Sequence, residues 1–124
     1  MLIVEEQNNK YNNILIIKPH GKMIIDDLNL FILKFNHYME SYESFKCIFD
    51  LRIMNDSPLD LTIKLGAYMK KNRKNIKNKL LYSIIIINNN LVKQFLNVLF
   101  SIVEPASPYY ITNNIEDINQ YICM

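Results

Sequence analysis

The sequence predicts an α/β fold in which a mixed sheet of four to five strands is covered by about four helices. Three observations lead to this prediction. Short runs rich in β-branched residues alternate with segments whose apolar residues recur every three or four positions. Two of the strand segments are nearly continuous apolar runs, as expected for strands covered on both faces. After an initial pair of strands, a helix separates each strand from the next, which parallel crossovers require. The expected order is β-β-α-β-α-β-α-β-α.

The first half of the chain begins with two expected strands joined by a turn. Residues 2–6 (LIVEE) and 14–23 (ILIIKPHGKM) flank the turn-forming segment QNNKYNN and therefore predict a hairpin. A helix follows, with Asp26 or Asp27 as its N-cap. Its apolar residues at helical spacing are Leu28, Phe31, Ile32, Phe35, Tyr38, Met39 and Tyr42. Residues 45–51 (FKCIFDL) are the expected central strand.

The middle of the chain predicts a second helix and another buried strand. The helix runs from about Pro58 to a lysine cluster, and residues 80–87 (LLYSIIII) form the strand. The expected buried face of this helix is a stripe of Leu59, Ile63 and Ala67, widened by Leu61, Leu65, Tyr68 and Met69.

The last third predicts a helix, a short strand and a terminal helix. Asn90 is the expected cap of the first helix, which ends before Pro105. Its apolar face is Leu91, Phe95, Val98, Leu99 and Ile102. Residues 109–112 (YYIT) form the strand. Asn113 or Asn114 then caps the terminal helix, whose inward residues are Ile115, Ile118 and Ile122.

Composition narrows the class of protein. A chain of 124 residues, half of them hydrophobic and only two of them glycine, is expected to form one domain over residues 1–124. No apolar run approaches the roughly 20 residues of a membrane-spanning helix, and the N-terminus lacks the pattern of a secretory signal. Cys47 and Cys123 offer no disulfide framework, which favours a reducing, cytoplasmic location. His20 and His37 are expected on different elements, so we expect no metal site and no cofactor. For the same reason we do not expect the protein to be an enzyme.

Four short segments and the order of elements over about residues 1–122 resemble the STAS domain, the fold of bacterial anti-sigma-factor antagonists and of sulfate-transporter tails. The segments are KPHGKMIIDD, the strand end FDL, NDSPLD and LGAY. Asp56 and Ser57 stand before the second helix, where those antagonists have an Asp-Ser pair. The resemblance implies that Ser57 is phosphorylated by a partner kinase that also binds the unmodified form.

The residues around Ser57 also have a purely local interpretation. Ser57 is a favourable N-cap, Pro58 fits the first helical position, and Asp60 at N3 nearly completes a capping box. A phosphate on Ser57 would be attracted by the helix N-terminus but repelled by Asp56 and Asp60. Both interpretations, helix cap and regulatory phosphosite, remain at this point.

The segment KKNRKNIKNK forms a basic cluster. Its cations are Lys70, Lys71, Arg73, Lys74, Lys77 and Lys79. The excess of lysine over arginine and the lack of interleaved aromatic residues argue against nucleic acid as the partner. A solvated helix end followed by a loop accounts for the cluster, and weak contact with an anionic membrane surface is the alternative.

Two classes of function follow. The first is a non-enzymatic, regulatory protein-interaction module with an unknown protein partner, self-associating as a homodimer through the apolar helix at residues 91–100. Its candidate partner surface consists of Asp56, Asp60, Phe95 and Leu99. The alternative is a carrier domain for a small apolar ligand or a lipid, suggested by aromatic and Met-rich helix faces. Asp50 ends a central strand without a Gly-rich phosphate loop and is interpreted as structural.

Overall fold

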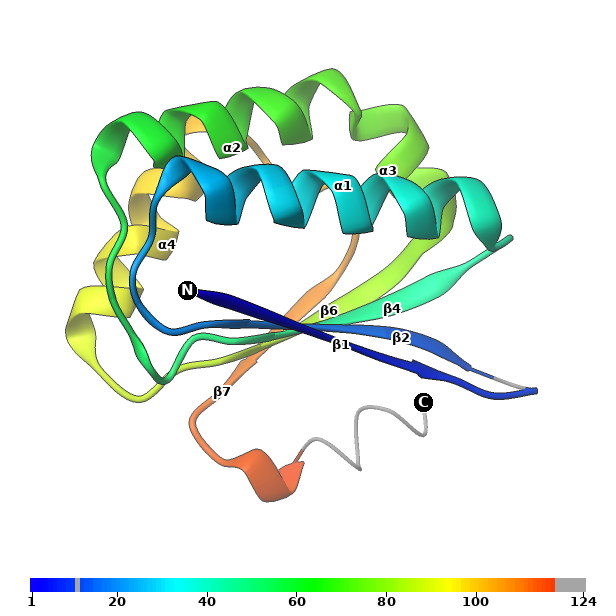
Figure 1. Cartoon of the computed structure of the whole chain (residues 1–124), viewed down its shortest axis with the longest axis horizontal. Coiled ribbons are helices and arrows are strands. Elements are labelled where there is room, and N and C mark those ends of the chain that lie inside the picture. Colours follow the sequence, from blue (N-terminus) through cyan, green and yellow to red (C-terminus); the bar gives the residue numbers. More distant parts are fainter. Residues whose placement is uncertain (11, 118–124) are drawn as a thin grey trace.

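The computed structural model shows a five-stranded mixed sheet with helices on one face (Figure 1), and it describes residues 1–10 and 12–117. The strands are β1 Leu2–Asn8, β2 Asn13–Pro19, β3 Gly21–Lys22, β4 Phe45–Asp50, β5 Met54–Asp56, β6 Leu80–Ile86 and β7 Tyr109–Thr112. The α-helices of the described residues are α1 Ile25–Ser41, α2 Leu59–Lys71, α3 Arg73–Lys79 and α4 Asn90–Ile102. The predicted α/β class and its main strands are therefore confirmed.

The main sheet has the strand order β1-β2-β4-β6-β7. The hairpin of β1 and β2 is antiparallel, whereas β2, β4, β6 and β7 run parallel to one another. The predicted central strand is thus β4. Alternate residues face the helices, and the opposite face of the sheet carries a second apolar cluster of Ile14, Ile16, Ile48, Tyr82, Ile84 and Ile86. Apolar residues on both faces explain why β4 and β6 lack polar alternation.

A small second sheet, which the sequence did not predict, joins the two loops that lead into α1 and α2. In it β3 lies parallel to β5. Gly21 has φ 71°, a left-handed conformation that favours glycine. Its N–H donates to the Ile53 carbonyl at 3.0 Å, and the Met23 N–H donates to the Asp56 carbonyl at 3.0 Å. Strands of two and three residues are too short to produce a readable alternation.

The predicted caps of α1 and α4 are each displaced. The N-cap of α1 is Ile24, and Asp27 at N3 accepts the Ile24 N–H at 2.9 Å. Asp27 therefore caps the helix from inside its first turn, which the preference for Asp at N-cap did not reveal. The N-cap of α4 is Asn89, whose side chain accepts the Val92 N–H at 3.0 Å. The predicted cap, Asn90, is already the first helical residue.

The buried face of α2 differs from the predicted one. Leu59 and Ile63 are 62% and 49% exposed, and Ala67 is also exposed. The helix buries Leu61, which the prediction included, together with Thr62 and Gly66, which it did not. A Cβ added at Gly66 would lie 2.7 Å from Cγ2 of Ile102 in α4, so the missing side chain lets the two helices approach. Packing against α4, which no periodicity encodes, rotates the Leu59 stripe toward solvent.

The basic cluster and the chain end differ from prediction in detail. The lysine cluster continues as α3 where a loop was expected, because Ile76, only 4% exposed, anchors that helix on the core. After β7 a short 3₁₀ turn, η1 Ile115–Asp117, occupies the start of the predicted terminal helix, and the Asn114 side chain accepts the Glu116 N–H at 3.0 Å. Ile118 and Ile122 lie outside the described residues.

Candidate partner-binding groove around Ser57

Ser57 lies between β5 and α2 and is not the N-cap of that helix. The N-cap is Pro58, whose carbonyl accepts the N–H groups of Leu61 and Thr62 at 3.0 and 3.1 Å. The Ser57 hydroxyl instead pairs with the Thr62 hydroxyl at 3.2 Å. Thr62 is buried, and its hydroxyl also donates to the Pro58 carbonyl at 3.3 Å. The prediction that Ser57 caps α2 is therefore wrong, because proline takes that place with its own extended backbone.

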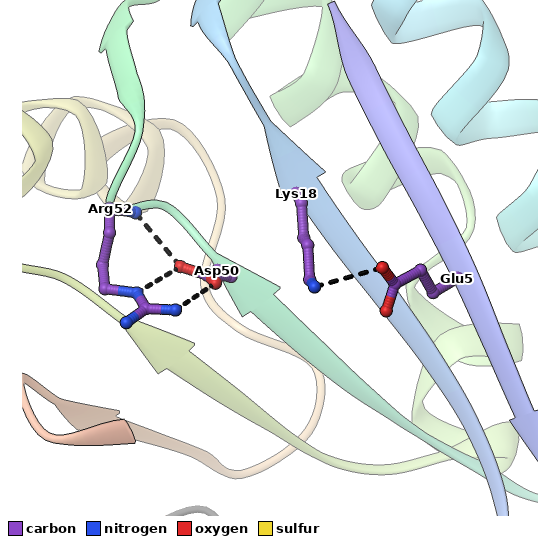
Figure 2. A network of polar contacts seen from close by, with 4 residues as sticks. All are labelled: Glu5, Lys18, Asp50 and Arg52. Carbon is purple, nitrogen blue, oxygen red and sulfur yellow. Dashed lines mark hydrogen bonds and ion pairs between the residues drawn. The ribbon is translucent and has the colours of Figure 1, made fainter. Parts of the chain in front are cut away.

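An ion pair at the end of β4 fixes the turn that leads through β5 to Ser57. Figure 2 shows Asp50 at the end of β4 facing Arg52, which lies in the turn before β5. The guanidinium donates to both carboxylate oxygens at 2.8 and 2.7 Å, and the Arg52 N–H adds a bond of 3.3 Å. These donors hold the pKa of Asp50 below its usual value, and burial opposes them only in part. The interpretation of Asp50 as structural agrees with this geometry.

A second pair stands next to it on the hairpin. Lys18 of β2 donates to Glu5 of β1 at 3.1 Å, and the charge of Lys18 also lowers the pKa of Asp50 (Figure 2). Because Asp50 already binds Arg52 through both oxygens, its carboxylate is occupied by the fold. It therefore serves to place β5 rather than to bind a ligand.

Ser57 opens onto a surface groove of about 260 Å³ between the start of α2 and the outer side of α4. One wall consists of Met54, Asn55, Asp56, Ser57, Leu59 and Thr62, and the other of Leu91, Val92, Gln94, Phe95 and Val98. Three of these apolar side chains are exposed: Leu59, Leu91 and Val98. Exposed apolar side chains gathered around a groove are typical of a surface that contacts another molecule.

The structure brings together part of the predicted partner surface. Asp56 and Phe95 line the groove with Ser57, whereas exposed Asp60 stands in the first turn of α2 outside the lining. Within the described part of the chain, neither acidic side chain has a hydrogen-bond or ion-pair partner. Leu99 is only 5% exposed and faces the interior, so its assignment to the surface is wrong. Self-association stays a prediction, and the side chains available to it are those of the groove rim.

Sequence reasoning placed Leu59, Leu91 and Val98 on the apolar faces of their helices. It expected residues 91–100 to form a self-association surface, but it did not identify which side chains are exposed. One signal was present: α2 has leucine or isoleucine at 59, 61, 63 and 65, which lie on different sides of a helix. A helix packed on one side of a sheet cannot bury all of them. The sequence alone did not reveal which of them remain exposed.

The basic cluster lies at the opposite end of α2 and is divided by the fold. Lys79 donates to the Tyr42 carbonyl at 3.1 Å, and Arg73 binds the backbone and the carboxylate of Glu104. The exposed remainder is Lys70, Lys71, Lys74 and Lys77. A contact between these lysines and an anionic membrane stays a prediction.

The other potentially reactive side chains of the described residues are either buried or far from one another. Burial raises the pKa of the Cys47 thiol, which keeps it protonated and unreactive. Among the described residues, no three His, Cys, Asp or Glu side chains gather as metal ligands would. The helices within that same part of the chain are too short or too polar to cross a membrane.

Two solved structures are similar to almost the whole chain. One is an uncharacterised protein of the DUF3478 family from Shewanella loihica PV-4 with a SpoIIAA-like fold, at TM-score 0.72 and 11% identity, over 98% of this chain and 94% of that one. The other is the anti-sigma factor antagonist SpoIIAA in its unphosphorylated form, at TM-score 0.64 and 10% identity, over 98% of both chains. This chain has the SpoIIAA-like, STAS-type fold. The predicted resemblance to STAS domains is thus confirmed at the level of the fold.

Comparisons of the sequence with protein-family models and with curated proteins find no match. The STAS-type fold is therefore recognised through structure, at identities of 10 and 11%. Of these two structures, one is that of an anti-sigma factor antagonist and the other is that of an uncharacterised protein.

Proposed function

We propose that residues 1–124 form one STAS-type domain that acts in the cytoplasm as a non-enzymatic, regulatory protein-interaction module. Its partner is a protein that docks in the groove between α2 and α4. The observation that carries this proposal is the position of the Ser57 hydroxyl in a groove rimmed by exposed Leu59, Leu91 and Val98. The centres of protein interfaces are commonly apolar and depleted in charge. The three exposed side chains around this groove are apolar in the same way.

Phosphorylation of Ser57 is the proposed control of docking. Ser57 is only partly buried, whereas its hydrogen-bond partner Thr62 is 2% exposed, so Ser57 is the accessible hydroxyl. A phosphate brings a charge of about −1.5 to −2 into the groove, beside the carboxylate of Asp56. An apolar partner surface would then desolvate that charge, which weakens binding. The similar antagonist was solved in its unphosphorylated form, which supports control by phosphorylation for a protein of this fold.

The test is a binding series on a partner captured from the native cell. Ser57→Asp should weaken the affinity about 30-fold, or ~2 kcal/mol, because a charge enters a desolvated contact. Ser57→Ala should bind within about threefold of wild type, since it adds no charge. Lys74→Asp, a new carboxylate on an exposed position of α3, is the control and should leave binding within about twofold.

Equal binding by wild type, Ser57→Ala and Ser57→Asp would refute control by Ser57. Sedimentation of wild type at tens of micromolar, an order-of-magnitude range for weak complexes, separates a second copy from a different protein as the occupant. A dimer that Leu91→Asp dissociates without unfolding would assign the groove to self-association.

A further inference from the structure

An apolar cavity of about 170 Å³ lies between the helices and the sheet and is partly open to the surface. Its wall includes Phe31 and Phe35 of α1, Leu61 and Leu65 of α2, Ile85 of β6 and Leu99 of α4. All three larger helices and the helix-facing side of the sheet therefore contribute to one internal space.

The lining of this cavity excludes a charged ligand. Its described wall contains no lysine, arginine or histidine. Its acidic residue, Asp27, already accepts the Ile24 N–H at 2.9 Å. Two of its serines are also engaged, since Ser57 pairs with Thr62 and Ser107 donates to the Ile76 carbonyl at 3.5 Å. An anionic head group would find no lysine, arginine or histidine in this wall, and the nearby Met1 ammonium is already paired with Asp27 at 3.7 Å. A water molecule would find few of the polar partners that hold it.

The volume sets the size of a suitable ligand. In another protein, an apolar cavity of about 150 Å³ stays dry and binds benzene or xenon. Pockets for larger, drug-sized ligands are about 300–1,000 Å³. The cavity in this chain belongs to the first class, so it suits a molecule of roughly one aromatic ring and is too small for a long-chain lipid.

The cavity and the surface groove share part of their walls. Met54, Ser57 and Phe95 line both of them. The groove therefore adjoins the cavity at these three side chains. Phe95 is half-buried and stands on the α4 side of this boundary.

We propose that the internal cavity is a binding site for a small, neutral, apolar molecule about the size of one aromatic ring. The ligand enters from the groove beside Phe95. This site is distinct from protein docking, and it narrows the carrier alternative to small ligands rather than lipids.

The primary test uses the wild-type full chain with ¹³C-labelled Ile, Leu and Val methyl groups, titrated with benzene. Saturable chemical-shift changes are expected at Leu65, Ile85 and Leu99. Exposed Leu59 and Leu91 serve as internal controls and should change little. Changes confined to those exposed methyls, or no saturable change up to the solubility limit of benzene, would overturn the proposal. This titration needs no partner, so its outcome is independent of the docking hypothesis.

A filling variant and its matched control locate the site. Ala106 lines the cavity, and Ala106→Leu should weaken benzene binding at least about 10-fold by occupying the space. Ala67→Leu makes the same change on the exposed side of α2 and should keep the wild-type affinity. A folded Ala106→Leu variant with unchanged affinity would refute the internal location. If that variant fails to fold, the wild-type titration decides alone.

A charged ligand of the same size tests whether the cavity prefers neutral molecules. Benzoate has the same ring as benzene but carries a carboxylate, and it should cause no saturable change at the cavity methyls at pH 7. Binding of benzoate as tight as that of benzene would contradict the neutral ligand class, because it would require a cation in the wall.

Discussion

The two ends of α2 both carry charged clusters, yet only the N-terminal end forms a groove. The helix has 13 residues, so its ends lie about 20 Å apart. At the N-terminal end, Asp56 and Ser57 face α4 across the groove. At the C-terminal end, Lys70 and Lys71 are exposed, as is Lys74 in the following helix α3. A charge cluster in the sequence therefore becomes a candidate site where a second helix or strand faces it.

The only two arginines of the chain repeat this contrast, one near each end of α2. The Arg52 guanidinium lies 2.7 Å from the Asp50 carboxylate. The Asp50 side chain is only 10% exposed. Arg73 is paired at 3.9 Å with Glu104, whose side chain is 89% exposed. The first pair is partly desolvated and fixes the turn between β4 and β5. The second is a solvated surface pair, and such pairs contribute little to stability.

The largest expected effect is on stability at the groove end. Arg52→Met should lower the free energy of unfolding by about 2 kcal/mol, because it leaves the buried carboxylate of Asp50 without its charged donors. Arg73→Met is the matched change and should cost less than about 1 kcal/mol. Urea unfolding of both variants measures the difference. Equal losses of unfolding free energy in the two variants would show that the two arginine ion pairs contribute equally to stability.

A smaller effect is expected in the pH dependence of stability. The pKa of Asp50 is lowered in the folded state, chiefly by Arg52, so its ionised form stabilises the fold. That contribution is fully present above the ordinary aspartate pKa of about 3.9 and is lost as the pH falls through the lowered value. The stability gap between wild type and Asp50→Asn should therefore narrow below about pH 4. A gap that stays constant from pH 6 to acid unfolding would remove Asp50 as the source.

The same contrast explains what the sequence alone predicts. The strands β4 and β6 were predictable because a short, continuous apolar run is typical of a strand that is covered on both faces. The groove was not, because it depends on α4 meeting α2, and the pair Gly66 and Ile102 that sets this approach is 36 positions apart in sequence. Ser57 was singled out as a candidate phosphosite or helix cap. Its place in the groove was not predicted, and the N-cap of α2 is Pro58 instead. Periodicity fixes a helix, whereas tertiary packing decides which of its apolar stripes is exposed.

The starts of α2 and α4, which face one another across the groove, differ in how they are capped. At α4, Asn89 accepts the Val92 N–H directly. At α2, the Ser57 side chain accepts no helix N–H and pairs with the Thr62 hydroxyl. Thr62 also holds the Pro58 carbonyl, so it keeps one hydrogen bond when the Ser57 hydroxyl is removed.

The smallest expected effect follows from this difference and returns to the role of Ser57. Asn89→Ala removes an acceptor that a helix N–H needs and should cost about 1 kcal/mol of stability. Ser57→Ala removes one partly buried hydroxyl pair and should cost about 0.5 kcal/mol, at the low end for a hydrogen bond. Parallel urea titrations compare the two alanine variants. A loss at Ser57 as large as that at Asn89 would mean that Ser57 caps α2 in solution. A clearly smaller loss leaves the hydroxyl free of a helix-capping role, so any strong effect of Ser57→Asp on partner binding then reports the charge in the groove.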